Sequence, residues 1–190
     1  MSHPALLPMP PDNILRAIHG RGGWESLEDN EAAFLYSILK DLPLFSTVVE
    51  IGCELGRSSV MIAMVAKDRH FNLHHCDFWV SGSHYAAEWI ACMHDIGSPF
   101  TLHHMNSSSV DLPEGTVINL LYVDGDHEAA GISADCDHYL HMIPEGGYVA
   151  FHDYGRGSLP SVKPTVDNYM VETSWEPLGV SRTMAIWRRK

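Results

Sequence analysis

Short apolar runs alternate with amphipathic stretches along most of this chain. From residue 47 onward, most runs that read as buried strands are followed by a stretch whose apolar residues recur at helical spacing. The pattern predicts strands at 47–53, 71–79, 100–108, 117–125 and 146–154, and helices among them at 58–67, 83–95 and 128–143, the first opened by Ser58. Strands and helices in this order imply a parallel sheet that is covered on both faces.

The two ends of the chain complete this pattern. A Pro-rich lead-in over residues 1–12 precedes two predicted helices, at 13–20 and 30–43. Near the C-terminus a third helix is predicted at 161–172, followed by two strands, at 175–181 and 183–189, that are joined by a short turn around Ser181. We therefore expect an α/β fold: a doubly wound, mostly parallel seven-stranded sheet with helices on both faces and an antiparallel C-terminal hairpin. Within this single structural domain, residues 1–44 form an N-terminal helical segment packed on the core of residues 45–190.

Composition narrows the classes of partner. Apolar residues make up 45% of the 190 residues, enough for a sizeable core, and the formal net charge is -12. Such an acidic chain argues against nucleic-acid binding, which relies on clustered Lys and Arg. No apolar run reaches the ~20 residues that span a bilayer, and the N-terminus lacks the features of a signal peptide. Because none of the four cysteines forms a C-x-x-C pair, we expect free thiols and a cytoplasmic protein without a membrane partner.

The stretch "VVEIGCELGRSS" contains the first chemical motif. Gly52 and Gly56 follow a predicted strand, where they allow a tight turn and the close approach of a ligand to the backbone. The dinucleotide fingerprint G-x-G-x-x-G is absent because Glu54 and Arg57 occupy two of its positions. Asp77 ends the next strand, where a carboxylate can bind both hydroxyls of a ribose.

Together with "MNS" after the third strand and "DGDH" after the fourth, this order resembles S-adenosylmethionine-dependent methyltransferases of the Rossmann-like class. The segment "LLYVDGDHEAAGISADCDHYLHMIPEGGYVAFHDY" resembles the branch with macrolide and sugar O-methyltransferases and cephalosporin-hydroxylase-like proteins. The resemblance covers about residues 45–172 and implies S-adenosylmethionine as cofactor. It implies that the loop around the methionine part of the cofactor contains Glu50, Gly52, Cys53, Gly56 and Ser58. It also implies that Asp77 binds the ribose, that Asn106 and Ser107 line the adenine pocket, and that Asp124 after the fourth strand belongs to the cofactor site.

The same resemblance implies a metal and a base. In metal-dependent relatives, positions matching Asp124, His152 and Asp153 hold a divalent cation such as Mg or Mn, and one matching His127 is the general base. The imidazole of His152 suits manganese, iron, nickel or zinc better than magnesium. Adjacent strand residues point to opposite faces, so His152 and Asp153 share one ion only where the strand ends and the chain bends. Asp124 with Asp153 is therefore the more secure pair.

Other charged residues nearby have simpler interpretations. Asp126 is expected to cap the following helix, whereas Asp135, Asp137 and His138 are expected on its solvated side. The Gly- and Pro-containing stretch 154–164 has the composition of a mobile lid, in which Tyr154 and Arg156 contact either the substrate or another loop.

These features favour an O-methyltransferase acting on a small hydroxylated substrate, with Asp124 and His127 as catalytic residues. Two alternatives stay open at this point. One is a metal-dependent hydrolase or hydroxylase-like enzyme on the same fold. The other is a non-catalytic cofactor-binding subunit, for which the apolar stripe of residues 30–43 would form a homodimer face.

Overall fold

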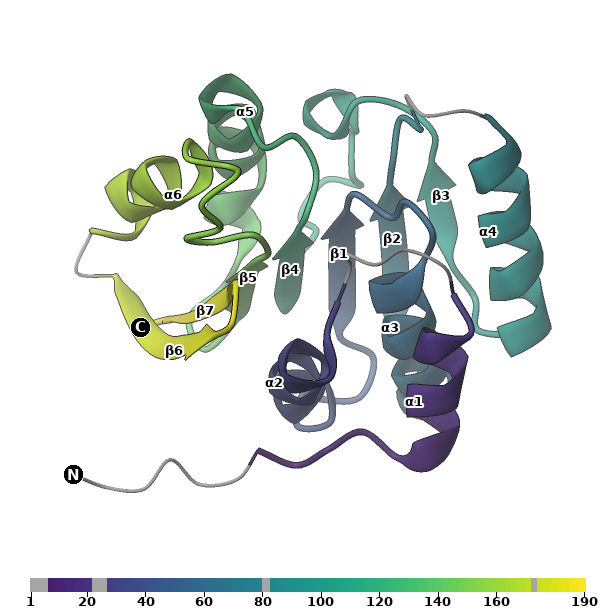
Figure 1. The fold of residues 1–190 in the computed structure, drawn as a ribbon. Coiled ribbons are helices and arrows are strands. Elements are labelled where there is room, and N and C mark those ends of the chain that lie inside the picture. Colours follow the sequence, from purple (N-terminus) through teal and green to yellow (C-terminus); the bar gives the residue numbers. More distant parts are fainter. Residues whose placement is uncertain (1–6, 22–26, 80–82, 172–173) are drawn as a thin grey trace.

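The computed structural model describes residues 7–21, 27–79, 83–171 and 174–190. Within these ranges the strands form one seven-stranded sheet with the order β3-β2-β1-β4-β5-β7-β6, which can be followed in Figure 1. Strands β1 to β5 pair in parallel, whereas β7 pairs antiparallel with both β5 and β6. The strands are β1 (Thr47–Ile51), β2 (Asn72–Cys76), β3 (Thr101–His103), β4 (Leu120–Val123), β5 (Tyr148–Phe151), β6 (Trp175–Ser181) and β7 (Met184–Arg189). The predicted doubly wound sheet and its C-terminal hairpin are confirmed.

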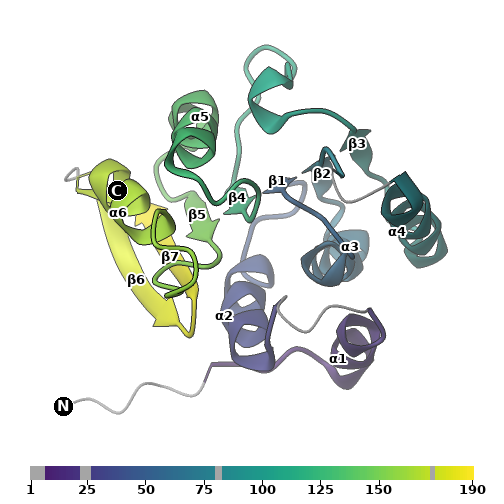
Figure 2. The ribbon, with the colours of Figure 1, turned by 45° about the horizontal axis from the view of Figure 1, so that its top comes forward.

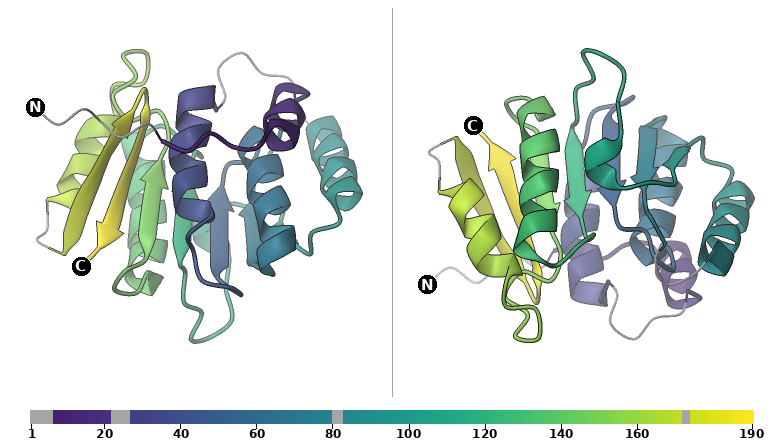
Figure 3. Two further views of the ribbon diagram at one scale, coloured as in Figure 1. Left: turned by 90° about the horizontal axis from the view of Figure 1, so that it is seen from below. Right: turned by 90° about the horizontal axis from the view of Figure 1, so that it is seen from above.

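Helices cover both faces of this sheet, as the tilted view in Figure 2 and the views from below and above in Figure 3 show. Of the α-helices in the described part of the chain, four lie on one face, α1 (Asp12–His19), α2 (Asp29–Leu39), α3 (Arg57–Arg69) and α4 (Ser83–Ile96), and two on the other, α5 (Ala129–Tyr139) and α6 (Val162–Met170). Residues 1–6 of the predicted Pro-rich lead-in and residue 172 of the predicted helix 161–172 lie outside the described part of the chain. Helix α3 begins at Arg57 after Gly56 as N-cap, not at Ser58, because Gly56 adopts a left-handed φ of 84° that ends the turn.

Alternating side chains of the central strands build two separate cores. Along β4, Leu120 and Tyr122 face the α1–α4 side, whereas Leu121 and Val123 face the α5–α6 side. Strand β5 alternates in the same way. Both faces are buried, which explains why the sequence of these strands is continuously apolar rather than alternating.

The N-terminal helices belong to the first core. Helix α1 packs on α3 through Ile14 and Ile18, and α2 buries Ala32, Leu35 and Leu39. The apolar stripe that was considered a homodimer face is thus covered by the protein's own sheet, and it is not available to a second copy. The reason is that α2 fills the face beside α3, over β4, β5 and β7.

Two further features concern the cysteines and the apolar character of the helices. The four cysteines are free thiols, with Cys53, Cys76 and Cys136 buried and Cys92 half-buried. Within the described ranges, none of the helices is both long and apolar enough to cross a membrane.

The carboxyl ends of β1, β4 and β5 bring the candidate site residues to one edge of the sheet. In doubly wound folds, ligands bind at this edge where the strand order reverses, which here is between β1 and β4. Strand β5 ends at Phe151, and the chain bends at Asp153, which has a φ of 55°. This bend lets His152 and Asp153 face the same side, as their shared site requires.

Candidate active site

The turn after β1 is the first element of the site. Gly52 has a φ of 82°, and a Cβ on it would lie 2.0 Å from the backbone oxygen of Asp124. The turn after β1 therefore packs directly against the chain that leaves β4, which only glycine permits. A side chain on Gly56 would meet Trp89 in the same way, at 2.8 Å. The two glycines keep backbone rather than side chain at the start of α3, where the helix dipole favours anionic ligand groups.

Asp77 holds this turn in place from the end of β2. Its Oδ2 accepts hydrogen bonds from the backbone N–H groups of Cys53 (2.6 Å) and Glu54 (2.8 Å). Its Oδ1 accepts one from the N–H of Trp79 at 2.5 Å. The predicted ribose acid thus also joins the two loops that form one side of the site.

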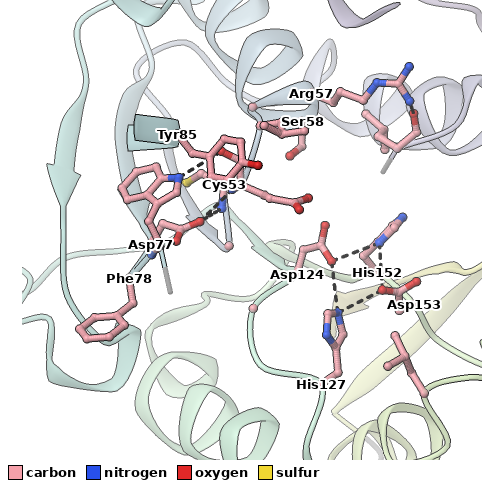
Figure 4. Close-up of a pocket in the computed structure, with 18 of the residues that line it drawn as sticks. Cys53, Arg57, Ser58, Asp77, Phe78, Tyr85, Asp124, His127, His152 and Asp153 are labelled. Atoms are coloured by element: carbon pink, nitrogen blue, oxygen red, sulfur yellow. Dashed lines mark hydrogen bonds and ion pairs between the residues drawn. The ribbon is translucent and has the colours of Figure 1, made fainter. Parts of the chain in front are cut away.

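One cavity of about 620 Å³ runs from this turn to the ends of β4 and β5 (Figure 4). At one end Cys53, Asp77, Phe78 and Tyr85 lie together, and at the other are the acids and histidines of the "DGDH" and "HDY" segments. The predicted site residues in its lining are Gly52, Cys53, Gly56, Ser58, Asp77, Asp124, His127, His152 and Asp153. Residues from four separate loops therefore converge on a single cavity.

Glu50 is a predicted cofactor residue that lies outside this lining. Its carboxylate is fully buried on the α3–α4 side of β1, where its Oε2 accepts hydrogen bonds from Ser59 Oγ and His75 Nδ1, both at 2.6 Å. Ser59 in turn accepts a hydrogen bond from Trp89 Nε1 at 2.9 Å. In this structure Glu50 supports the glycine turn from behind.

Asn106 and Ser107 also lie outside the cavity lining. The side chain of Asn106 accepts hydrogen bonds from the backbone N–H and hydroxyl of Ser108. The Ser107 hydroxyl donates to Asp135 on α5. Asp135 is only 2% exposed, so the expectation that it is solvated is wrong. Helix α5 turns Asp135 and Tyr139 toward the loop after β3, where both contact Ser107, and nothing in the local sequence indicates the position of that loop.

Asp126 lies two residues before Glu128, the N-cap residue of α5, and so, contrary to the expectation, does not cap the helix itself. Its Oδ1 accepts a hydrogen bond from the N–H of Glu128 just before α5 begins. Its side chain lies so close to Gly131 that a Cβ there would be 2.4 Å from its carboxylate. Asp126 therefore stabilises the start of α5.

The acids and histidines after β4 and β5 form a compact cluster (Figure 4). His152 Nδ1 lies 3.1 Å from Asp124 Oδ1 and 3.7 Å from Asp153 Oδ2. His127 Nε2 lies 3.0 Å from Asp153 Oδ2 and 3.8 Å from Asp124 Oδ1. Arg156 donates to the other oxygen of Asp153 at 3.0 Å.

Charge pairing shifts the pKa of every member of this cluster. Close polar contacts with the carboxylates of Asp124 and Asp153 raise the pKa of His127 to about 9. Burial disfavours the cation of His152, but attraction to Asp124 dominates and raises its pKa to about 12. Although burial acts the other way, His152 and His127 hold the pKa values of Asp124 and Asp153 below their ordinary range. Without a ligand, the cluster therefore consists of paired ions.

The residues of the cluster also fit a divalent cation. Asp124, His152 and Asp153 each offer a ligand atom, and these atoms lie within 4.8 Å of one another. His127 Nε2 is buried, and despite its closeness to Asp153 it has no hydrogen bond of good geometry among the described residues. This nitrogen lies between Asp153 and Asp124, so it carries a proton in the metal-free cluster. One imidazole and two carboxylates suit manganese, iron, nickel or zinc better than magnesium.

Sequence reasoning missed Glu31, which contacts this cluster from α2. Its Oε2 lies 3.3 Å from His152 Nε2, and its side chain is buried. It is 121 residues from His152, and in the sequence it reads as an ordinary polar residue in the first turn of a helix. Of the two loop residues considered for substrate contact, Arg156 lines the cavity, whereas Tyr154 donates to Asp167 outside it.

Comparison with known proteins identifies the family. The methyltransferase domain family matches residues 49–154, which span β1 to the end of the "HDY" segment. The chain belongs to this methyltransferase family. The match confirms the class that the glycine turn, the acid after β2 and the "DGDH" segment indicated. No curated protein sequence matches this methyltransferase.

Solved structures with low sequence identity share the fold. CalS11, a TDP-rhamnose 3'-O-methyltransferase of calicheamicin biosynthesis, is 16% identical over 82% of this chain and 75% of its own, with a TM-score of 0.69. The methyltransferase PaMTH1 from Podospora anserina, solved with bound S-adenosylhomocysteine (SAH), is 12% identical over 97% of this chain and 91% of its own, with a TM-score of 0.71. A putative rRNA methylase from Clostridium thermocellum is 12% identical over 87% and 100%, with a TM-score of 0.67. The fold alone therefore does not distinguish small-molecule from RNA acceptors.

Proposed function

We propose that this protein is an S-adenosylmethionine-dependent O-methyltransferase that acts on a small hydroxylated molecule. The observation that carries the proposal is a single cavity lined at one end by the glycine turn and Asp77, and at the other by Asp124 and His127. The first end has the backbone cradle and the acid that a nucleoside bearing an amino-acid chain requires. The structural neighbour PaMTH1 holds SAH, the demethylated cofactor.

In the proposed reaction, an acceptor hydroxyl oxygen attacks the methyl carbon of the sulfonium. The new C–O bond forms as the C–S bond breaks, and the bonding pair returns to sulfur to give SAH. His127 Nε2, in its unprotonated form, takes the hydroxyl proton at the acceptor end of the cavity; a cation on Asp124 and Asp153 would favour that form, because it would compete with His127 for their negative charge. Holding both reactants in one cavity supplies most of the remaining acceleration.

A divalent cation held by Asp124, His152 and Asp153 would lower the pKa of hydroxyl groups of the acceptor. These three residues also orient the acceptor end in their own right. Asp124 accepts a hydrogen bond from the buried Tyr122 hydroxyl at 3.3 Å, and Arg156 fixes Asp153. The bend after β5 keeps their carboxylates on the same side.

A small acceptor is supported by charge and by one neighbour. The net charge of -12 opposes binding of an RNA backbone. CalS11 methylates a hydroxyl of a nucleotide-linked sugar, as its name states. The cavity volume of about 620 Å³ also falls in the range of small-molecule and cofactor sites.

Calorimetric titration with SAH tests the cofactor part of the proposal. We expect saturable binding by the wild-type protein. The Asp77→Ala variant should bind at least tenfold more weakly, because it loses a charged hydrogen-bond acceptor for both the turn and the ligand. Asp68→Ala, at an exposed position of α3, is the matched control and should bind normally. An absence of heat up to millimolar SAH with correctly folded protein would refute the proposal.

A further inference from the structure

Glu31 connects the N-terminal helix α2 to the cluster of acids and histidines. It is 2% exposed, and both oxygens of its carboxylate are occupied. Oε1 accepts hydrogen bonds from the backbone N–H (3.0 Å) and the hydroxyl (2.8 Å) of Thr183, in the turn between β6 and β7. Oε2 accepts one from the N–H of Glu28 at 3.0 Å and lies 3.3 Å from His152 Nε2. Three elements far apart in the sequence thus fix the position of one carboxylate.

This arrangement determines which nitrogen of His152 carries a proton. A carboxylate only accepts hydrogen bonds, so the imidazole nitrogen that faces Glu31 must be the donor. Nε2 therefore bears the hydrogen. The other nitrogen, Nδ1, is directed toward Asp124 and Asp153, at 3.1 Å and 3.7 Å from their oxygens. By the same rule Nδ1 also carries a proton in the metal-free cluster, where His152 is a cation. When a metal replaces the proton on Nδ1, the hydrogen bond to Glu31 keeps the remaining proton on Nε2 and leaves Nδ1 as the ligand atom.

We propose that Glu31 is a positioning residue that fixes His152 in its Nε2–H tautomer, so that Nδ1 serves as the nitrogen ligand of a divalent transition metal beside Asp124 and Asp153. A ligating histidine commonly donates its second N–H to a carboxylate, which sets the ring orientation and increases the basicity of the ligand. The inference rests on the proposed function in that it concerns the metal part of the same site. It assigns α2 a role in the site beyond covering the sheet.

Replacing Glu31 by Gln tests the tautomer directly. The amide oxygen can still accept from Thr183, but the amide nitrogen would face His152 Nε2 as a donor. Nε2 must then accept, and the hydrogen moves to Nδ1, where it blocks metal ligation and points at Asp124 instead. The size of the side chain is unchanged, so the packing of α2 is largely preserved.

Mn²⁺ binding to tag-free protein, measured by calorimetry, is the primary readout. We expect the Mn²⁺ affinity of Glu31→Gln to fall by about 10- to 100-fold, the usual effect of losing such a partner. Asp29→Asn makes the same chemical change two residues earlier, where the side chain is exposed and pairs with His19, and it should retain wild-type affinity. Thr183→Val removes one of the four donors around Glu31 and should have an intermediate effect. SAH affinity should be the same in all variants.

The tautomer itself can be read by long-range ¹H–¹⁵N spectra of Zn²⁺-loaded protein, which should show Nε2–H at His152 in the wild type. Wild-type Mn²⁺ affinity in both Glu31→Gln and Thr183→Val, or an Nδ1–H signal at His152, would overturn the inference. If Glu31→Gln does not fold, Thr183→Val alone decides. Protein that binds SAH but no Mn²⁺ would refute this inference and leave the proposed methyl transfer intact, whereas failure to bind SAH would refute the proposed function.

Discussion

The nitrogen Nε2 of His127 lies between two carboxylates, yet none of the described residues gives it a hydrogen bond of good geometry. This placement separates two roles that a histidine could have at this position. A structural histidine would be bonded at both ring nitrogens, whereas a base needs one nitrogen directed at the reacting group. His127 lines the acceptor end of the cavity, so it can take the second role when Nε2 is unprotonated.

We predict that His127→Asn lowers kcat for methyl transfer by about 10²- to 10⁴-fold, the usual contribution of a general base. SAH affinity should stay within twofold of wild type, because His127 lies at the opposite end of the cavity from Asp77. The measurement is SAH release from S-adenosylmethionine with an accepted hydroxylated substrate. Full activity in the variant would show that another group, or water, removes the proton.

Asp135 is a buried acid whose energy depends on pH. Burial raises its pKa from 3.8 to about 6, and the hydrogen bond from Ser107 only partly opposes this. Because the folded state binds the Asp135 proton more tightly than the unfolded state, the contribution of Asp135 to the free energy of unfolding is most favourable at low pH. It falls as the pH rises from about 4 to about 6, and it stays lower above that.

We therefore predict that Asp135→Asn raises the free energy of unfolding at pH 7.5 by up to about 3 kcal/mol, the value of roughly two pKa units. At pH 4 the gain should largely disappear. Urea unfolding at the two pH values measures the difference. Asp111→Asn, at an exposed position, is the control and should change neither value. An equal gain at both pH values would mean that charge on Asp135 is not the cause.

At the scale of elements, the turn after β1 is where backbone shape matters most. Gly52 and Gly115 share a left-handed φ, of 82° and 78°, but differ in their surroundings. A Cβ on Gly52 would lie 2.0 Å from the Asp124 carbonyl oxygen, whereas a Cβ on Gly115 would have nothing within 4 Å. The pair separates the cost of the conformation from the cost of the contact.

We predict that Gly115→Ala lowers the free energy of unfolding by about 1 kcal/mol, the cost of a left-handed alanine. Gly52→Ala should cost more than about 3 kcal/mol and also weaken SAH binding, because the turn must move away from β4. Denaturant unfolding and SAH titration of both variants provide the comparison. Equal costs at the two positions would mean that the turn relaxes around the added methyl group.

The elements were predictable from the sequence because their signals are local. Doubly buried strands produce continuous apolar runs, although β5 ends at Phe151 rather than at the predicted residue 154, because the chain bends at Asp153. The contact between Glu31 and His152 was not predictable, because nothing in the sequence indicates that α2 packs beside the end of β5. The first turn of a helix also favours acidic residues whether or not they have a role in a site. Asp135 was missed for a similar reason, since only the position of the loop after β3 makes its side of α5 an interior one.

For the whole molecule, ligand binding and folding are coupled through the loops that the cavity joins. We predict that SAH at about 100 times its dissociation constant raises the free energy of unfolding by about 2.7 kcal/mol. The Asp77→Ala variant should gain much less at the same concentration. Thermal unfolding with and without SAH tests this, and an equal shift in both proteins would place the ligand away from Asp77.

The net charge of the chain helps to distinguish an RNA acceptor from a small-molecule acceptor, which the fold does not. An RNA methylase needs a basic surface, because contacts with phosphates supply most of the affinity for the backbone. This chain has 12 Lys and Arg against 24 Asp and Glu. We therefore predict that labelled RNA binds more weakly than about 100 µM at physiological salt, measured by fluorescence anisotropy, while SAH binds in the same buffer. Saturable micromolar binding that weakens steeply with added salt would instead reveal a local basic surface, and the proposed small-molecule acceptor would have to be abandoned.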